Sequence, residues 1–242
     1  EHLGHMDKAM GVYQLGTKLF PRDRQLLGLQ AHLLHISGLE EQAQPLYEKI
    51  LKIDPENADA HLGLAQIDRA LGFLDRSAEH YDRTLKDFGL RPQVWREYAE
   101  VLYESRDYQA AEVAVRKALE LAPDDESSLD LALILREGGD LSGAIEALAP
   151  LVQAGRSDAV QAKALWLIEA GRYPEAGAMA EGLLRAQPAQ PLAHYIRARV
   201  HLISGRKAQA LADLRLASTL GKQAPFTARV CAQLAASLEA RP

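Results

Sequence analysis

Apolar side chains recur at helical spacing along the chain. Residues 25–37 and 40–52 each place their apolar positions three and four residues apart, which predicts two amphipathic helices. Gly38 lies between them, and a glycine after an apolar helical run favours the left-handed conformation that ends a helix. Asp54-Pro55 ends the second stretch, because proline disfavours helix at the residue before it. The predicted unit is a helix, a tight turn, a second helix and another turn.

This unit repeats with a period of about 34 residues. An alanine series has steps of 34, 34, 33, 32, 34 and 34 residues and consists of Ala31, Ala65, Ala99, Ala132, Ala164, Ala198 and Ala232. A glycine series keeps the same period, with Arg106 in place of one glycine, and consists of Gly4, Gly38, Gly72, Gly139, Gly171 and Gly205. Neither helix of a unit is long enough to be stable alone, so each unit is expected to bury its apolar faces on its neighbours.

The period divides the chain into six predicted repeats between two incomplete ends. The repeats span residues 24–57, 58–91, 92–124, 125–156, 157–190 and 191–224. Residues 1–23 are expected to hold the last turn of a first helix, ending at Gly4, and a complete second helix. Residues 225–242 are expected to form one further helix. We interpret residues 1–242 as a single superhelical array, and its start within a repeat suggests a piece of a longer array.

One region departs from the period. Between Ala144 and Ala164 the chain is two residues short, and Pro150 falls within the predicted second helix. A proline there removes a backbone hydrogen bond and tends to kink the helix. Two interpretations stay open: a surface loop that has drifted in length, and a local change of superhelix curvature or a flexible joint.

The repeat at 92–124 carries the clearest signature. Its first helix has Trp95, Tyr98, Ala99 and Leu102, and its second has Tyr108, Ala111, Val115, Ala118 and Pro123. In these positions the chain resembles the tetratricopeptide repeat, a helix–turn–helix unit. The resemblance implies an all-α fold, a right-handed α-solenoid of such units. It implies little about chemistry, because the signature residues are packing residues.

Composition narrows the function classes. The formal net charge of −5 does not favour general nucleic-acid binding, which calls for a strongly basic face. No run of 18 apolar residues is present, so no membrane span is expected. The single cysteine, Cys231, lies in an apolar stretch and is expected to be a buried small hydrophobe. The compartment stays open between cytoplasm and periplasm.

No catalytic motif is found. The sequence lacks a Walker loop, a Gly-x-Ser-x-Gly elbow and a His-Glu-x-x-His pair, so an enzyme and a bound cofactor are not expected. His32 and His35 lie three residues apart, but a stable zinc site needs a third and a fourth ligand. His2 and His5 repeat that spacing with the same limitation, and no metal is expected.

Other titratable residues favour structural roles. His194 and His201 fall at packing positions of their repeat and are expected to be partly buried. Glu97, Glu100 and Glu104 share one helix and are expected to form a solvated acidic stripe.

Charge is unevenly distributed along the chain. Residues 92–124 carry four basic and seven acidic residues, whereas residues 191–224 carry six basic residues and one acidic residue. This asymmetry could orient a dipolar partner, and the alternative is ordinary solvated helix faces.

In tetratricopeptide arrays the first helix of each unit lines the concave face, where ligands usually lie. The resemblance therefore places a set of predicted partner-binding residues on that face: His32, His35, Gln66, Arg69, Arg96, Glu100, Tyr103, Glu104, Arg136, Glu169, Tyr195 and Arg199. Chaperone-binding members of the family hold a peptide carboxylate with Lys and Asn at fixed groove positions, and this chain lacks that set.

These observations favour a non-catalytic scaffold that binds another protein or a peptide on its concave face. The alternative is an adaptor or assembly segment of a larger protein, such as the periplasmic repeat region of a bacterial exopolysaccharide secretion protein or the repeat region of a glycosyltransferase. An independent enzyme is the least supported class. Self-association through apolar faces exposed at the terminal repeats is a further expectation.

Overall fold

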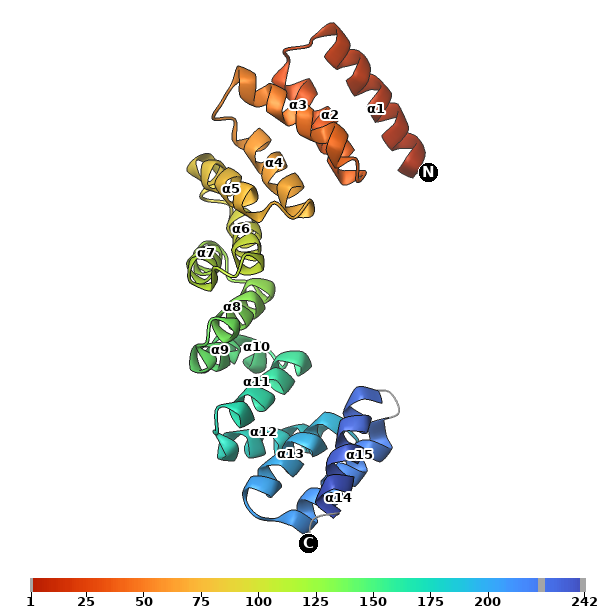
Figure 1. Cartoon of the computed structure of the whole chain (residues 1–242), viewed down its shortest axis with the longest axis vertical. Coiled ribbons are helices and arrows are strands. Elements are labelled where there is room, and N and C mark those ends of the chain that lie inside the picture. Colours follow the sequence, from red (N-terminus) through yellow and green to blue (C-terminus); the bar gives the residue numbers. More distant parts are fainter. Residues whose placement is uncertain (1, 222–224, 240–242) are drawn as a thin grey trace. The chain divides into compact units, whose positions relative to one another are not determined.

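The computed structural model describes the backbone of residues 2–221 and 225–239 and the side chains of residues 8–221 and 229–239 (Figure 1). Within these residues the regular structure is helical and no strand is present, which confirms the all-α helical repeat fold. None of the described helices is both long and apolar enough to cross a membrane.

The first helices of the pairs start at the first residue of each predicted repeat, 24, 58, 92, 125, 157 and 191. The helices are α1 (His2–Leu19), α2 (Arg24–Ile36), α3 (Glu40–Ile53), α4 (Ala58–Ala70), α5 (Leu74–Phe88), α6 (Pro92–Glu104), α7 (Tyr108–Leu121), α8 (Asp125–Glu137), α9 (Leu141–Ala147), α10 (Ala149–Gln153), α11 (Ser157–Glu169), α12 (Tyr173–Ala186), α13 (Pro191–Ile203), α14 (Lys207–Leu220) and α15 (Pro225–Glu239). They form two compact units, Glu1–Ile134 (unit 1) and Leu135–Pro242 (unit 2).

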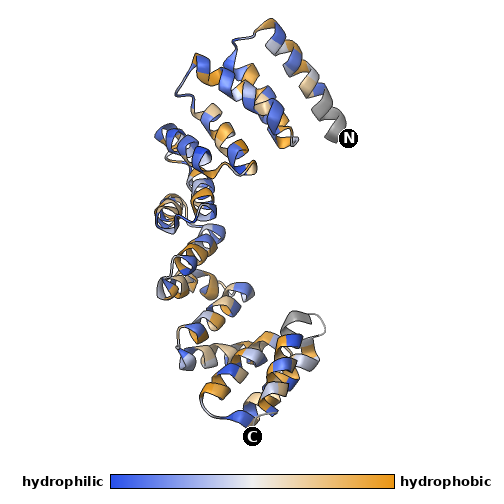
Figure 2. Ribbon diagram, in the orientation of Figure 1, coloured by the Kyte–Doolittle hydropathy of each residue, from blue (hydrophilic) through white to orange (hydrophobic). Residues whose placement is uncertain are grey.

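Hydrophobic and hydrophilic residues alternate along the helices (Figure 2), and each unit has a core of buried apolar side chains. In unit 1 the ring of Tyr47 on α3 fills the space against α4, where Gly63 leaves room for it. In unit 2 Cys231 is fully buried beside Ala198 and Leu214, as expected for a small hydrophobe. The small residues of the alanine series let paired helices approach closely.

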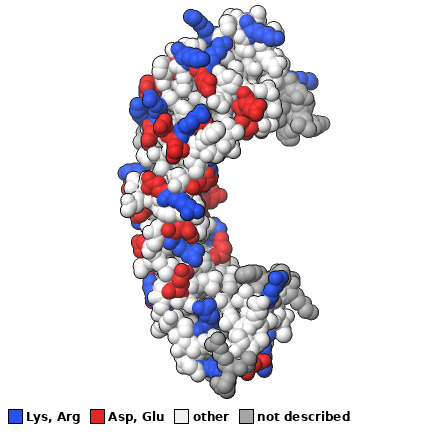
Figure 3. Space-filling model, in the orientation of Figure 1, with Lys and Arg blue, Asp and Glu red and all other residues white. Residues whose placement is uncertain are grey.

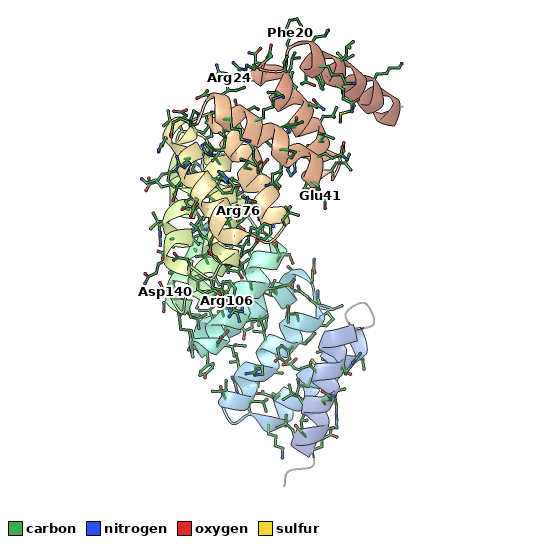
Figure 4. All side chains as sticks on the ribbon, turned by 45° about the horizontal axis from the view of Figure 1, so that its top comes forward. Phe20, Arg24, Glu41, Arg76, Arg106 and Asp140 are labelled. Atoms are coloured by element: carbon green, nitrogen blue, oxygen red, sulfur yellow. The ribbon has the colours of Figure 1, made fainter. Side chains whose placement is uncertain are left out.

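The turns between paired helices explain the glycine series. Gly38, Gly72, Gly139, Gly171 and Gly205 all have positive φ angles, which glycine adopts without steric cost. Arg106, which takes the place of a glycine in the sequence pattern, has φ of 65° in the turn between α6 and α7 (Figure 4). The turn therefore keeps its geometry even where the residue is not glycine.

Gly4 is an exception, because α1 continues through it, so the expectation that a helix ends there is wrong. A glycine permits the left-handed turn but does not impose it. Inside a helix it costs only about 1 kcal/mol relative to alanine.

At Pro150 the structure has two helices where the sequence predicted one kinked helix. α9 ends at Ala147 and α10 begins at Ala149, with Pro150 in the first turn of the new helix. That position suits proline, whose missing N–H has no partner to lose there. Whether this break acts as a joint stays a prediction.

Two repeats bury polar triads at positions where the repeat at 24–57 has the leucines Leu27, Leu34 and Leu46. The triad of repeat 58–91 is His61, Asp68 and His80, and the triad of repeat 191–224 is His194, His201 and Asp213. The burial of His194 and the partial burial of His201 confirm the structural role expected for them.

The two triads have the same geometry with aspartate and histidine exchanged. His61 Nδ1 lies 2.8 Å from His80 Nδ1, and in the other triad His194 Nδ1 lies 2.9 Å from Asp213 Oδ1. Each triad has a second, longer contact. In repeat 58–91 Asp68 Oδ2 lies 3.8 Å from His80 Nε2, and in repeat 191–224 Asp213 Oδ2 lies 3.7 Å from His201 Nε2. In each triad the histidine at the start of the first helix also bonds a proline carbonyl through Nε2, at 2.9 Å and 3.0 Å.

The stability of unit 1 is expected to fall as the pH drops from 6.5 toward 4. Burial, followed by the charges of His61, Arg76 and Arg83, lowers the pKa of His80 to about 4, below its ordinary value of 6.5. The unfolded chain then binds a proton in this window that the folded chain does not, so folding loses stability as the pH falls. Burial raises the pKa of Asp68, which opposes part of the effect.

His80→Leu, which introduces the leucine found at residue 46, should reduce this pH dependence. The free energy of unfolding of unit 1 at each pH is measured by urea unfolding, followed by Trp95 fluorescence in a Trp166→Phe background. An equal pH slope in the two proteins would contradict the role given to His80.

Candidate functional site

A network of charged side chains joins the first helices α4 and α6. The guanidinium of Arg69 donates to Glu100 Oε2 at 2.5 Å through Nη1 and to Glu104 Oε1 at 2.6 Å through Nη2. Burial by itself lowers the pKa of Arg69, but the hydrogen bonds to Glu104 and Glu100 outweigh burial and raise it. One arginine therefore holds two carboxylates that lie one turn apart on α6.

Glu97 is held by two neutral donors. Gln66 Nε2 donates to Glu97 Oε2 at 2.8 Å, and the hydroxyl of Tyr81 on α5 donates to the same oxygen at 2.9 Å. Tyr81 is fully buried, and burial together with Glu97 raises its pKa. The acidic stripe expected on α6 is in part open to solvent, with the side chains of Glu100 and Glu104 33% and 41% exposed. Its three glutamates also accept hydrogen bonds from neighbouring helices, which the sequence did not indicate.

Arg96 extends the network to α8. Its Nη1 donates to Glu126, and its Nε lies 3.9 Å from Glu100 Oε1. Both arginines of the network thus have carboxylate partners on a neighbouring helix. We call the set of side chains from the three first helices the charged face: Gln66, Arg69, Arg96, Glu97, Glu100, Glu104, Glu126 and Asp130. Figure 3 shows acidic and basic side chains intermingled on the visible face of unit 1.

Asp130 on α8 is a member of the charged face that the sequence reasoning missed. It is half-buried and makes no hydrogen bond or ion pair within the described part of the chain. Burial, followed by the negative charge of Glu100, raises its pKa to about 6. A signal was present in the sequence, because Asp130 and Glu97 occupy the same position of successive repeats.

An apolar hollow lies beside these carboxylates in unit 1. Its lining residues are Arg69, Ala99, Glu100, Tyr103, Glu104, Asp130, Leu133 and Ile134, and its volume is about 160 Å³. An apolar cavity of about 150 Å³ accommodates a benzene-sized group. Leu133 is 43% exposed, so apolar surface is open to a ligand there. We call this site the apolar hollow.

The structure brings six of the predicted partner-binding residues together around the charged face and the apolar hollow: Gln66, Arg69, Arg96, Glu100, Tyr103 and Glu104. His32 and His35 lie apart from them on α2. His32 is exposed, and Nδ1 of His35 lies 3.8 Å from Glu40 Oε1. No hydrogen bond or ion pair links either histidine to α4 or α6 among the described residues.

Among the residues that the structure describes, no group of three or more His, Cys, Asp or Glu side chains is arranged to hold a metal ion. The side chains of His2 and His5 lie outside the described residues.

In unit 2 the predicted residues fall into two separate pairs. Arg136 Nη2 lies 3.4 Å from Glu169 Oε2, and its guanidinium carbon lies 5.4 Å from the centre of the Trp166 ring. Arg199 Nη1 donates to the hydroxyl of Tyr195 at 2.8 Å. No hydrogen bond or ion pair joins the two pairs in the described part of this unit.

Three family models described as tetratricopeptide repeat match residues 36–101, 92–125 and 162–225, together more than half of the chain. The chain belongs to the tetratricopeptide repeat family. Comparison with curated protein sequences gives no match.

Solved structures of tetratricopeptide proteins share this fold. The C-terminal part of a TPR repeat-containing protein from Cytophaga hutchinsonii superposes with a TM-score of 0.75 at 12% identity, over 94% of this chain and 94% of that one. YrrB, described as a TPR protein with an unusual peptide-binding site, has a TM-score of 0.58 at 17% identity, over 77% of this chain and 97% of that one.

The Naa15/Naa10 structure bound to HypK-THB has a TM-score of 0.67 at 19% identity. It covers 97% of this chain, which spans 36% of the matched chain. At these identities the likeness shows the fold alone. Tetratricopeptide repeats are in general a non-catalytic protein-interaction fold.

Self-association of this tetratricopeptide chain stays a prediction. Val12, Leu15 and Leu19 follow one another at helical spacing on α1 and are 65%, 59% and 64% exposed. They form an apolar stripe on the first described helix.

Proposed function

We propose that the chain is a non-catalytic scaffold that binds another protein or a peptide on its first helices, with the charged face and the apolar hollow of unit 1 at the centre of the site. The observation that carries this proposal is the placement of that face. Side chains from three successive first helices line one surface, and an apolar hollow opens beside them. Stacked repeats use such surfaces to hold partners.

The remaining predicted residues stay proposed partner contacts, each within its own unit. In unit 1 these are His32 and His35 on α2, and in unit 2 they are the two pairs Arg136–Glu169 and Tyr195–Arg199. The adaptor alternative, a segment of a secretion protein or a glycosyltransferase, stays a prediction that the sequence of the full-length gene would test.

Selection of displayed random peptides of about a dozen residues on the full chain tests the proposal. We expect selected peptides to lose about tenfold or more in affinity for the double variant Glu100→Ala/Glu104→Ala, because loss of central polar contacts weakens binding by such factors. The matched control is Glu112→Ala/Glu120→Ala, which removes two glutamates from ion pairs on the second helix α7.

Fluorescence anisotropy with each selected peptide measures the affinities. Peptides that bind both double variants as tightly as the unchanged chain would contradict a site on the charged face. Failure to select any peptide would contradict peptide binding by this chain.

A further inference from the structure

The charged face carries more negative than positive charge. Five of its members are carboxylates, Glu97, Glu100, Glu104, Glu126 and Asp130, whereas two, Arg69 and Arg96, are guanidinium groups. Both arginines already donate to these carboxylates. Neither cation is therefore free to neutralise a further acidic group, and a ligand meets a surface of net negative charge.

Asp130 is a member of the charged face that has no cationic hydrogen-bond partner among the described residues. It is a half-buried lining residue of the apolar hollow, near Glu100, and forms no ion pair within the described residues. The charge of Arg96 acts on it from a distance, but burial and Glu100 outweigh that charge and raise its pKa. An ionised carboxylate beside another carboxylate gains from a cation placed between them, since opposite charges within a few ångströms favour the ionised form. A lysine or arginine of a ligand would supply that cation.

The apolar hollow defines a second requirement. Its lining includes the apolar side chains of Ala99, Leu133 and Ile134 and also Tyr103. An apolar side chain of a ligand that enters the hollow removes apolar surface from water on the ligand and on the protein, and this burial favours binding. Glu100, Glu104 and Asp130 line the same hollow. The apolar and the acidic groups are thus close enough to contact neighbouring residues of one ligand.

We infer that the charged face binds an extended basic peptide segment, with one aromatic or branched aliphatic side chain in the apolar hollow and a lysine or arginine next to it opposite Asp130 and Glu100. This inference rests on the proposed function and names the chemistry of its partner. Acidic peptides and nucleic-acid phosphates would place negative charge against a surface on which five carboxylates face two guanidinium groups.

The composition of the peptides selected on the full chain tests the inference. We expect enrichment of Lys and Arg around one apolar residue, and an affinity that falls as ionic strength rises from low to physiological. The variant Asp130→Asn/Glu100→Gln keeps side-chain shape and removes two charges, and it should weaken the selected basic peptides about tenfold. The control Glu112→Gln/Glu120→Gln on α7 should leave their affinity unchanged.

The hollow is tested by pairing Leu133→Ser with an alanine at the apolar position of a selected peptide. Each change alone should weaken binding, and the two together should cost little more than one, because both remove the same contact. Thermal melting of every variant by circular dichroism establishes that it is folded before its affinity is interpreted.

The possible failures are distinguishable. Peptides that bind through the charged face but are acidic or uncharged would overturn the inference and leave the proposed function standing. Additive effects of Leu133→Ser and the peptide alanine would overturn the place given to the apolar side chain. Peptides whose binding ignores every substitution on the charged face would contradict the proposed function itself.

Discussion

Replacing Asp213 with leucine is expected to destabilise unit 2 by about 3–5 kcal/mol, the loss typical of removing one partner from a buried ion pair. Asp213 is almost fully buried and accepts hydrogen bonds from Arg197 at 2.6 Å and 2.8 Å and from His194 at 2.9 Å. Burial alone raises its pKa, but the hydrogen bonds from Arg197 and His194 outweigh burial and lower it. Without the carboxylate, these donors lose their partner in the interior.

Repeat 24–57 indicates which substitutions should restore the stability lost by Asp213→Leu. Replacing His194, His201 and Asp213 together with leucine reproduces the apolar set of repeat 24–57 and should recover most or all of the lost stability. Well-packed apolar residues often equal or exceed a buried ion pair in stability. Urea unfolding followed by Trp166 fluorescence in a Trp95→Phe background reports unit 2. A single variant as stable as the unchanged chain, or a triple variant no better than the single one, would contradict this account.

Gly63→Ala is expected to destabilise unit 1 by roughly 1–3 kcal/mol through overpacking. A Cβ at this position would lie 2.2 Å from Cζ of Tyr47, whose ring is 4% exposed and has little room to move. Burial of that ring also raises the pKa of its hydroxyl to about 12. Helix propensity alone would favour alanine by about 1 kcal/mol, so steric overlap must outweigh it.

Gly182→Ala is the matched control, because Gly182 lies inside α12 and no heavy atom lies within 4 Å of an added Cβ. It should stabilise unit 2 by roughly 0.5–1 kcal/mol. Urea unfolding with the tryptophan of each unit measures both changes. The two substitutions are expected to change the free energy of unfolding in opposite directions. A stabilised Gly63→Ala variant would contradict the steric argument and show that the ring of Tyr47 moves aside.

Much of the fold could be predicted from the sequence. The period located the starts of the first helices, and the glycine series located the turns. The series also predicted Arg106 in place of a glycine, and the structure adds that this arginine has a positive φ. These features follow from local physics, since helix spacing, proline and left-handed turns act within a few residues. Gly4 was predicted wrongly because a glycine permits a turn whose formation depends on packed neighbours.

The candidate site was predicted only in part. Repeat phase identified Arg69, Glu100 and Glu104, but it could not show that they form one ion-paired cluster. Asp130 was not among the predicted site residues, although it occupies the same repeat position as Glu97 and lines the apolar hollow.

The sequence by itself determined the helix pairs, their period and the tetratricopeptide family, because these depend on local propensity and on packing residues that recur in every repeat. Only the tertiary structure decided which polar groups meet. Glu97 meets Tyr81 across 16 residues, and Arg69 meets Glu104 across 35. Such pairs depend on how far one helix is rotated against the next, and a difference of one residue in helical phase turns a side chain by about 100°.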